Sequence, residues 1–202
     1  MIYLAPASDT QAHIWLHERI CFNSDKSLTA IYNMPFFYRL CPGHTLSIQQ
    51  LRQAFQLIVR KHESLRTSLF FDTEKNQLMQ RVIDYTDNNN RLFEFIESNF
   101  ESDEELDLIM QNEKRNSLLF DLAQGHVFRC HILHHTPISS NDLLCDKDAI
   151  IFNFHHALFD FPSMDVFLHD LNQAYTTSEL STNEDTILCY LDCEFEYLLL
   201  YI

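Results

Sequence analysis

The chain has few basic residues, few glycines and no long uninterrupted hydrophobic run. Its 202 residues carry 14 Lys and Arg against 29 Asp and Glu, which gives a formal net charge of −15. A surface that binds nucleic acid needs a basic stripe that neutralises phosphates and releases counterions. The chain has no such Lys/Arg cluster, so we expect no nucleic-acid partner.

Segments that would take the protein into or across a membrane are also absent from the sequence. No apolar run reaches the roughly 20 residues of a membrane span, and Met1 to Pro6 is too short and lacks the basic flank of a signal peptide. We therefore expect a cytoplasmic protein. Six cysteines without regular spacing favour reduced thiols over a disulfide framework. Cys189 and Cys193 lie one helical turn apart without a second pair, so we expect no metal site.

Six carboxylates gather in one short stretch: Glu97, Glu101, Asp103, Glu104, Glu105 and Asp107. Negative charge at the start of a helix interacts favourably with the helix dipole. This stretch is therefore interpreted as a solvated helix face.

Helical and strand patterns alternate along the chain. Periodicity predicts helices over Thr10 to Ile20, Ser47 to Lys61, Asp103 to Arg115 and Pro162 to Tyr175. It predicts strands over Ile31 to Leu40, Arg66 to Phe71, Leu78 to Ile83, Leu92 to Ile96, Val127 to Leu133 and Ala149 to Phe154. Pro42-Gly43 predicts a turn, and residues 137–146 and 176–185 predict polar connections. This alternation indicates an α/β sandwich, and the length is sufficient for one domain over residues 1–202.

A histidine pair stands between the last predicted strand and the last predicted helix. His155 and His156 follow a bulky apolar strand, and Asp160 comes four residues after His156. A strand end can present an imidazole to a ligand, and a carboxylate can orient that imidazole or brace the loop. Such pairs are also often satisfied core residues, and His134-His135 is a second pair without an obvious role. The pattern leaves both interpretations open.

Three motifs in order resemble the condensation domains of nonribosomal peptide synthetases. Residues 154–161, FHHALFDF, resemble the family's HHxxxDG signature. Residues 60–70, RKHESLRTSLF, resemble its RHExLRTxF segment with Lys61 in place of the arginine. Ser8, Gln11 and Trp15 match its SxAQxRLW motif, where His13 replaces the arginine. Weaker matches are FDLAQGHVFR at 120–129 and YLD at 190–192.

The resemblance implies one lobe of the chloramphenicol acetyltransferase-like fold, an α/β two-layer sandwich. In that family the domain joins a donor thioester to an acceptor amine, each carried on the phosphopantetheine arm of a carrier-protein domain. The second histidine, here His156, is the implied catalytic residue, as a base or as a stabiliser of developing charge. His155 is then a supporting residue, and Asp160 is expected to pair with Arg66 and hold the loop. No tightly bound cofactor is implied.

Two departures from the family pattern qualify these expectations. Phe161 occupies the position of the motif glycine, and the chain contains only Gly43 and Gly125. A glycine permits backbone conformations that phenylalanine resists, so we expect a reshaped loop or a partly filled tunnel. The resemblance also covers only the N-terminal half of the family's domain, with residues 176–202 as the start of a connection to a C-terminal lobe. A truncated gene model and a degenerate copy are both consistent with this.

Three functions follow from this pattern. The first is an amide-forming condensation lobe that is inactive as an isolated half and needs its C-terminal lobe and carrier domains as partners. The second is a noncatalytic interaction module. The third is an acyltransferase that uses a CoA thioester, because related families share an HxxxD core. A lobe separated from its partner should expose an apolar patch, which predicts self-association.

Overall fold

The computed structural model describes residues 4–23, 29–85, 92–135, 142–180 and 200–201. The helices are α1 (Asp9–Asn23), α2 (Ile48–Lys61), α3 (Asp103–Arg115) and α4 (Phe161–Thr177), with short 3₁₀ turns η1 (Glu63–Arg66) and η2 (Leu122–Gln124). The strands are β1 (Leu4–Pro6), β2 (Asn33–Leu40), β3 (Leu46–Ser47), β4 (Thr67–Asp72), β5 (Gln77–Val82), β6 (Glu94–Phe100), β7 (Phe128–His135), β8 (Leu143–Leu144), β9 (Ala149–His155) and β10 (Leu200–Tyr201).

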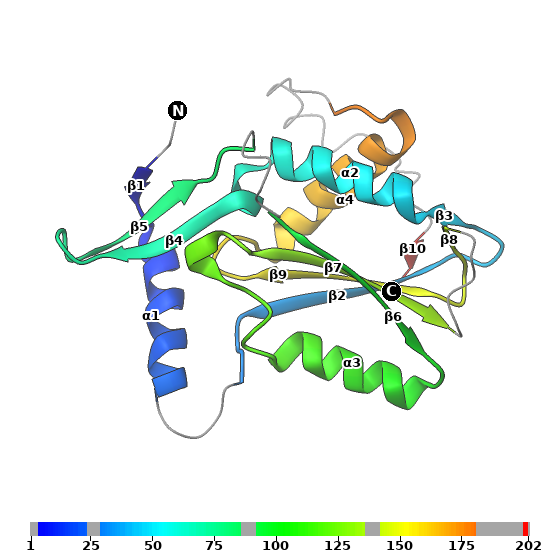
Figure 1. The fold of residues 1–202 in the computed structure, drawn as a ribbon, viewed down its shortest axis with the longest axis horizontal. Coiled ribbons are helices and arrows are strands. Elements are labelled where there is room, and N and C mark those ends of the chain that lie inside the picture. Colours follow the sequence, from blue (N-terminus) through cyan, green and yellow to red (C-terminus); the bar gives the residue numbers. More distant parts are fainter. Residues whose placement is uncertain (1–3, 24–28, 86–91, 136–141, 181–199, 202) are drawn as a thin grey trace.

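The largest of the three sheets formed by the described strands is central and has helices on both faces. The sheet has five strands in the order β10-β2-β9-β7-β6, and only the β6–β7 pair is parallel. Helices α2 and α4 cover one face and α3 covers the other (Figure 1). Helix α1 lies to one side, near the small sheet β1-β5-β4 (Figure 1). This arrangement confirms the predicted α/β sandwich.

Strand β9 is at the centre of the core because its side chains are apolar on both faces. All seven of its residues are buried. Phe152 and Phe154 pack with Phe55 and Phe167 in the cluster between the sheet and helices α2 and α4. Ile151 packs in the smaller cluster under α3. Near-continuous apolar sequence is typical of a strand that is covered on both faces, and here it fixes the position of the histidine pair at the end of β9.

The start of α2 shows how local capping and tertiary contact combine. The Ser47 hydroxyl accepts a hydrogen bond from the Gln50 backbone N–H at 3.2 Å, as in the capping box that a Ser-x-x-Gln sequence can form. The Gln50 side chain does not complete the box. It donates instead to the Tyr175 carbonyl at 2.9 Å, and the Ser47 N–H donates to the Tyr175 hydroxyl at 2.8 Å. The cap therefore attaches α2 to α4.

Most predicted elements are confirmed, some with different ends, and the structure also contains short strands that were not predicted, such as β1 and β8. Strand β6 begins at Glu94 and extends to Phe100, because it pairs in parallel with β7 along its whole length. Helix α4 continues through Thr177 and ends where Ser178 adopts a left-handed conformation with φ of 58°. The predicted polar loop contains strand β8, which pairs with β3. Cys189, Cys193 and the YLD segment lie outside the described residues.

The acidic stretch is exposed, but it is not one helix face. Asp103, Glu104 and Glu105 form the first turn of α3, and Ser102 caps that helix. Glu97 lies on β6, where its carboxylate is 3.3 Å from Arg52. In the part of the chain that the structure describes, none of the helices has the length and apolar character needed to cross a membrane.

Candidate active site

The two motif histidines are held by their backbones at the end of the central strand. His155 is the last residue of β9, and its N–H donates to the Val127 carbonyl at 3.0 Å. The His156 N–H donates to the Tyr32 carbonyl at 2.9 Å. Both backbones are therefore fixed by the chain segments beside β9. These backbone positions determine the directions in which the two side chains leave the chain.

The His156 imidazole is oriented by a carbonyl. Its Nδ1 atom lies 3.0 Å from the Phe159 carbonyl oxygen, and the side chain is half-buried. A carbonyl oxygen can only accept a hydrogen bond, so Nδ1 carries the hydrogen. In the neutral imidazole the Nε2 atom is then an unprotonated acceptor. This is the state in which histidine can remove a proton from a substrate.

The His155 imidazole has the opposite arrangement. This side chain is only 2% exposed, and its Nδ1 atom accepts a hydrogen bond from the Ala157 N–H at 3.2 Å. Its Nε2 atom must therefore carry the hydrogen, which it donates to the Glu18 carboxylate at 3.1 Å. Both ring nitrogens are engaged within the protein, and the ring links the motif loop to α1. Its supporting role in catalysis stays a prediction.

The expected ion pair between Asp160 and Arg66 is wrong. Asp160 is exposed and caps α4, where it accepts hydrogen bonds from the Ser163 hydroxyl and from the Ser163 N–H at 3.0 Å. Arg66 donates to the Ile83 carbonyl at 2.6 Å, and its second terminal nitrogen lies 3.4 Å from Glu63. The N-terminus of α4 provides unpaired N–H donors close to Asp160, so the carboxylate accepts a hydrogen bond from its own helix.

These local hydrogen bonds keep Asp160 ionised. The bond from the Ser163 hydroxyl holds the pKa of Asp160 below its usual value, against a smaller opposing effect of burial. The nearby His156 contributes in the same direction. Asp160 is therefore a negative charge close to the candidate base as well as a helix cap.

Phe161 does not need the conformational freedom of the glycine that it replaces. It is the first residue of α4, and it is not among the described residues with positive φ. Its side chain is 72% exposed and its ring lies edge-on to Phe36 at 5.6 Å. A helical backbone accepts any side chain at this position, so the loop is compatible with phenylalanine.

The upstream motif holds α2 against α4. The Asp170 carboxylate is 3% exposed and lies 2.8 Å from Lys61 Nζ and 2.5 Å from His62 Nε2. Burial raises the pKa of Asp170, but the hydrogen bonds from His62 and Lys61 outweigh it and leave the pKa below its usual value. Lys61 therefore has a structural partner that the sequence pattern did not indicate.

A hollow of about 700 Å³ opens beside His155. Its walls come from α1, from β4 and from the segment before η2, and include Trp15, Glu18, Phe71 and Phe120. Trp15 stacks on Phe71 at 5.8 Å between ring centroids. The α1 motif is formed locally, since Ser8 and Gln11 exchange hydrogen bonds as a capping box. The motif thus places Trp15 in the wall of the hollow that His155 also lines.

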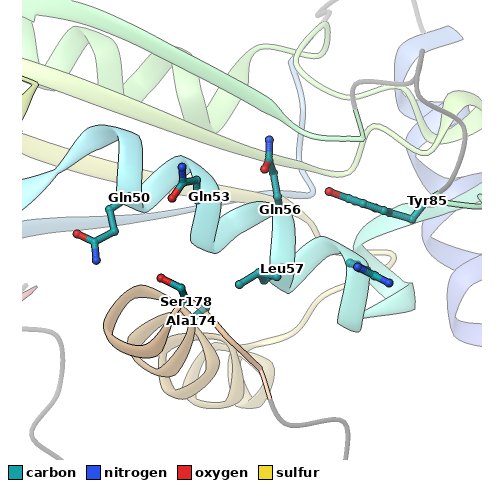
Figure 2. A pocket seen from close by; sticks show the side chains of 8 residues that line it. Gln50, Gln53, Gln56, Leu57, Tyr85, Ala174 and Ser178 are labelled. Atoms are coloured by element: carbon teal, nitrogen blue, oxygen red, sulfur yellow. The ribbon is translucent and has the colours of Figure 1, made fainter.

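A second, smaller hollow of about 310 Å³ lies away from the histidines. It is between α2 and the end of α4, and its polar lining comes mainly from Gln50, Gln53, Gln56, Arg60 and Tyr85 (Figure 2). None of the motif histidines contributes to it. Of the two hollows, the larger is the one with a motif histidine, His155, in its lining, and His156 is not part of that lining. Within the described ranges, no group of three or more His, Cys, Asp or Glu is arranged to bind a metal ion.

Sequence reasoning did not identify Glu18 and Tyr32 as part of the site. Glu18 is 137 positions from His155, and Tyr32 contacts both motif rings, with centroids 6.4 Å from His155 and 6.1 Å from His156. Neither residue belongs to a motif. A helical projection of α1 places Ile14 and Glu18 on one face, and that is the only local signal for Glu18.

Comparisons with known proteins show the family of this chain. The family described as Condensation domain matches residues 3–192. Surfactin synthase subunit 1 of Bacillus subtilis (strain 168) is 35% identical over 149 residues, which cover 74% of this chain and 4% of that protein. Fusarin C synthetase of Gibberella moniliformis is 28% identical over 183 residues, 91% of this chain and 4% of that protein. The chain therefore spans only a few per cent of the length of these relatives.

Solved structures support the fold. The condensation domain from Monacolin K polyketide synthase MokA is similar with a TM-score of 0.63 at 17% identity, over 90% of this chain and 36% of that chain. The epimerization domain from the third module of tyrocidine synthetase B gives 0.61 at 18% identity, over 87% and 35%. Because the family match covers nearly the whole sequence, this chain belongs to the condensation domain family.

Proposed function

We propose that this chain is the histidine-bearing lobe of a domain that forms amide bonds between carrier-bound substrates in nonribosomal peptide synthesis. The observation that carries the proposal is the state of His156. Its Nδ1–H is bound by the Phe159 carbonyl at 3.0 Å, which leaves Nε2 as a hydrogen-bond acceptor on a half-buried ring. A general base needs this arrangement, and it is built by the motif loop itself.

The proposed step is attack of an amine on a thioester. The amine nitrogen forms a bond to the thioester carbonyl carbon, and His156 Nε2 accepts the proton that the amine loses. The carbon–sulfur bond then breaks, and the departing thiolate receives that proton. The carboxylate of Asp160 is a negative charge close to His156 during both events. The products are an amide and a free thiol.

The partners follow from the same reaction. The two substrates would be carried on phosphopantetheine arms of carrier-protein domains, and no tightly bound cofactor of the lobe itself is needed. The match to the MokA condensation domain covers 36% of that chain. We therefore propose a C-terminal condensation lobe as the second wall of the site, and an isolated lobe with little or no turnover.

A noncatalytic role is the second candidate, and it rests on the motif loop. The exposed Phe161 follows Asp160 directly in the chain. Asp160 and Arg66 do not pair with each other: Asp160 bonds to Ser163, and Arg66 bonds to the Ile83 carbonyl. A lobe with this loop could keep the fold and bind a partner without turnover. Detection of amide product that depends on His156 excludes this candidate.

The test is amide synthesis by this chain co-expressed with the C-terminal lobe of a condensation domain. Carrier-bound aminoacyl donor and acceptor are supplied, and product is followed by mass spectrometry. His156→Ala should lower the rate by about 100-fold or more, since general-base catalysis contributes about 10²–10⁴. His44→Ala is the matched control, because His44 is exposed and follows the end of β2 that pairs with the start of β9, whereas His155 ends that strand. Equal rates in the two variants would refute the proposal, and turnover with a CoA thioester but not with carriers would favour the CoA-dependent alternative.

A further inference from the structure

Helix α1 carries a thiol that is connected to the motif histidines through two other side chains. The His17 Nδ1 atom lies 2.8 Å from the Tyr32 hydroxyl oxygen. The His17 Nε2 atom lies 3.7 Å from the Cys21 sulfur, one helical turn further along. Each of the two imidazole nitrogens of His17 therefore has a partner, and the three side chains form a continuous chain of contacts.

A thiol, an imidazole and a hydroxyl in this order are the groups expected around an activated nucleophile. A nucleophilic thiol is activated by a base within hydrogen-bonding reach, and the base is in turn oriented by a third group. Here the three groups are Cys21, His17 and Tyr32. Burial is the largest cause that raises the pKa of Tyr32, so its hydroxyl stays neutral and can hold the imidazole at neutral pH. Cys21 is half-buried and does not belong to the fully buried core.

The thiol lies on the same side of the sheet end as the motif. Tyr32 contacts the rings of His155 and His156, with centroids 6.4 and 6.1 Å away. Glu18, one turn before Cys21 on α1, binds His155 at 3.1 Å. The segment of α1 that carries Cys21 is therefore joined to the motif histidines through Glu18 and through Tyr32.

We propose that Cys21 is an acyl-accepting nucleophile that takes an acyl group from a thioester, with His17 as its base and Tyr32 as a positioning residue. The sulfur of Cys21 forms a bond to the thioester carbonyl carbon while His17 Nε2 accepts the thiol proton. The bond from that carbon to the original sulfur breaks, and His17 returns the proton to the departing thiolate. The products are S-acyl-Cys21 and a free thiol. The choice of a thioester rests on the proposed function, whereas the Cys21–His17–Tyr32 arrangement does not.

The test uses the full 202-residue chain and S-hexanoyl-N-acetylcysteamine as the probe, with intact-mass measurement and peptide mapping. We expect one hexanoyl group, located on Cys21, and none in Cys21→Ser. His17→Gln should slow acylation by at least tenfold, and Tyr32→Phe by a smaller factor. The matched controls are Cys41→Ser and Cys145→Ser, since both of these residues are also half-buried and, among the described residues, the thiol that hydrogen-bonds to an imidazole is that of Cys21. These two variants should acylate at the parent rate.

A parallel measurement does not depend on a thioester. Iodoacetamide should alkylate Cys21 faster than Cys41 and Cys145, and His17→Gln should abolish this preference. Thermal melting of each variant shows whether it is folded. Equal acylation of all three cysteines, or an unchanged rate in a folded His17→Gln variant, would overturn the proposal. The readout is an adduct on this chain alone, whereas amide synthesis needs both carriers and the second lobe, so the two proposals can fail separately.

Discussion

At the scale of single residues, the neighbouring histidines differ in which nitrogen carries the hydrogen. The Phe159 carbonyl selects the Nδ1–H form of His156, and the Ala157 N–H together with Glu18 selects the Nε2–H form of His155. Two identical side chains in sequence therefore receive different chemical properties from their neighbours. The His156 ring keeps Nε2 as a hydrogen-bond acceptor, and both nitrogens of the His155 ring are hydrogen-bonded within the protein.

Asp160 gives a prediction at this scale. Because its carboxylate caps α4 through Ser163, Asp160→Ala should lower the free energy of unfolding by about 1 kcal/mol. Urea denaturation measures this change. Asp160→Asn, which can still accept from the helix N–H groups, should lose much less. Equal losses in the two variants would show that the charge, rather than the cap, is what stabilises the helix.

At the scale of elements, two buried carboxylates hold helices in place. Asp170 joins α4 to the end of α2 through Lys61 and His62. On the other face, Glu113 of α3 is fully buried and lies 2.8 Å from His131 and 3.1 Å from Arg129 on β7. Removing one partner of such a buried pair leaves an uncompensated charge, which is costly.

The Asp170 contacts predict a loss of stability and a change in its pH dependence. Asp170→Asn should destabilise the protein by about 3 kcal/mol, the lower end of the range for breaking a buried pair. The folded-state pKa of Asp170 is below its usual value, so the carboxylate stabilises the fold fully above that usual value. This contribution is lost as the pH falls through the lowered pKa.

The measurement is urea denaturation between neutral pH and about pH 3, below the usual pKa of an aspartate. The difference in unfolding free energy between the parent and Asp170→Asn should be constant near neutral pH and shrink at the acidic end. Asp165→Asn is the control, because Asp165 is an exposed aspartate on the same helix. A difference that stays constant over the whole range would contradict the assignment of the lowered pKa to Asp170.

At the scale of the whole molecule, helix α1 has an apolar side that the described residues leave uncovered. Leu16 is 53% exposed and Ile20 is 58% exposed, one helical turn apart. The match to about a third of the MokA condensation-domain chain supports the proposal that a further lobe normally contributes to such surfaces. Exposed apolar surface of this kind favours association.

We therefore predict concentration-dependent self-association of the isolated chain. Sedimentation velocity over a roughly 100-fold concentration range should show species larger than a monomer, and Leu16→Gln with Ile20→Gln should shift the distribution toward monomer. Leu118→Gln is the control, since Leu118 is 86% exposed but does not belong to α1. A parent chain that stays monomeric over the whole range would contradict this prediction.

Local sequence was sufficient to place helices α1 to α4 and the longer strands and to identify the motifs. Apolar runs, caps and turn residues act over a few positions, so the helix at Asp103–Arg115 and the hairpin of β4 and β5 were predicted nearly to the residue. The order of three motifs was sufficient to predict the family, because each motif is a local pattern. The histidine pair was also placed correctly at a strand end, since the strand before it is continuously apolar.

Which groups meet was settled by tertiary contacts alone. Asp160 accepts a hydrogen bond from the first turn of its own helix instead of pairing with Arg66. Glu18 and Tyr32 contact the histidines from distant parts of the chain. Glu113, an acidic residue near the end of a largely exposed helix, became fully buried. A local pattern carries no information on such pairings, because the free energy of a buried polar contact depends on partners that folding brings together.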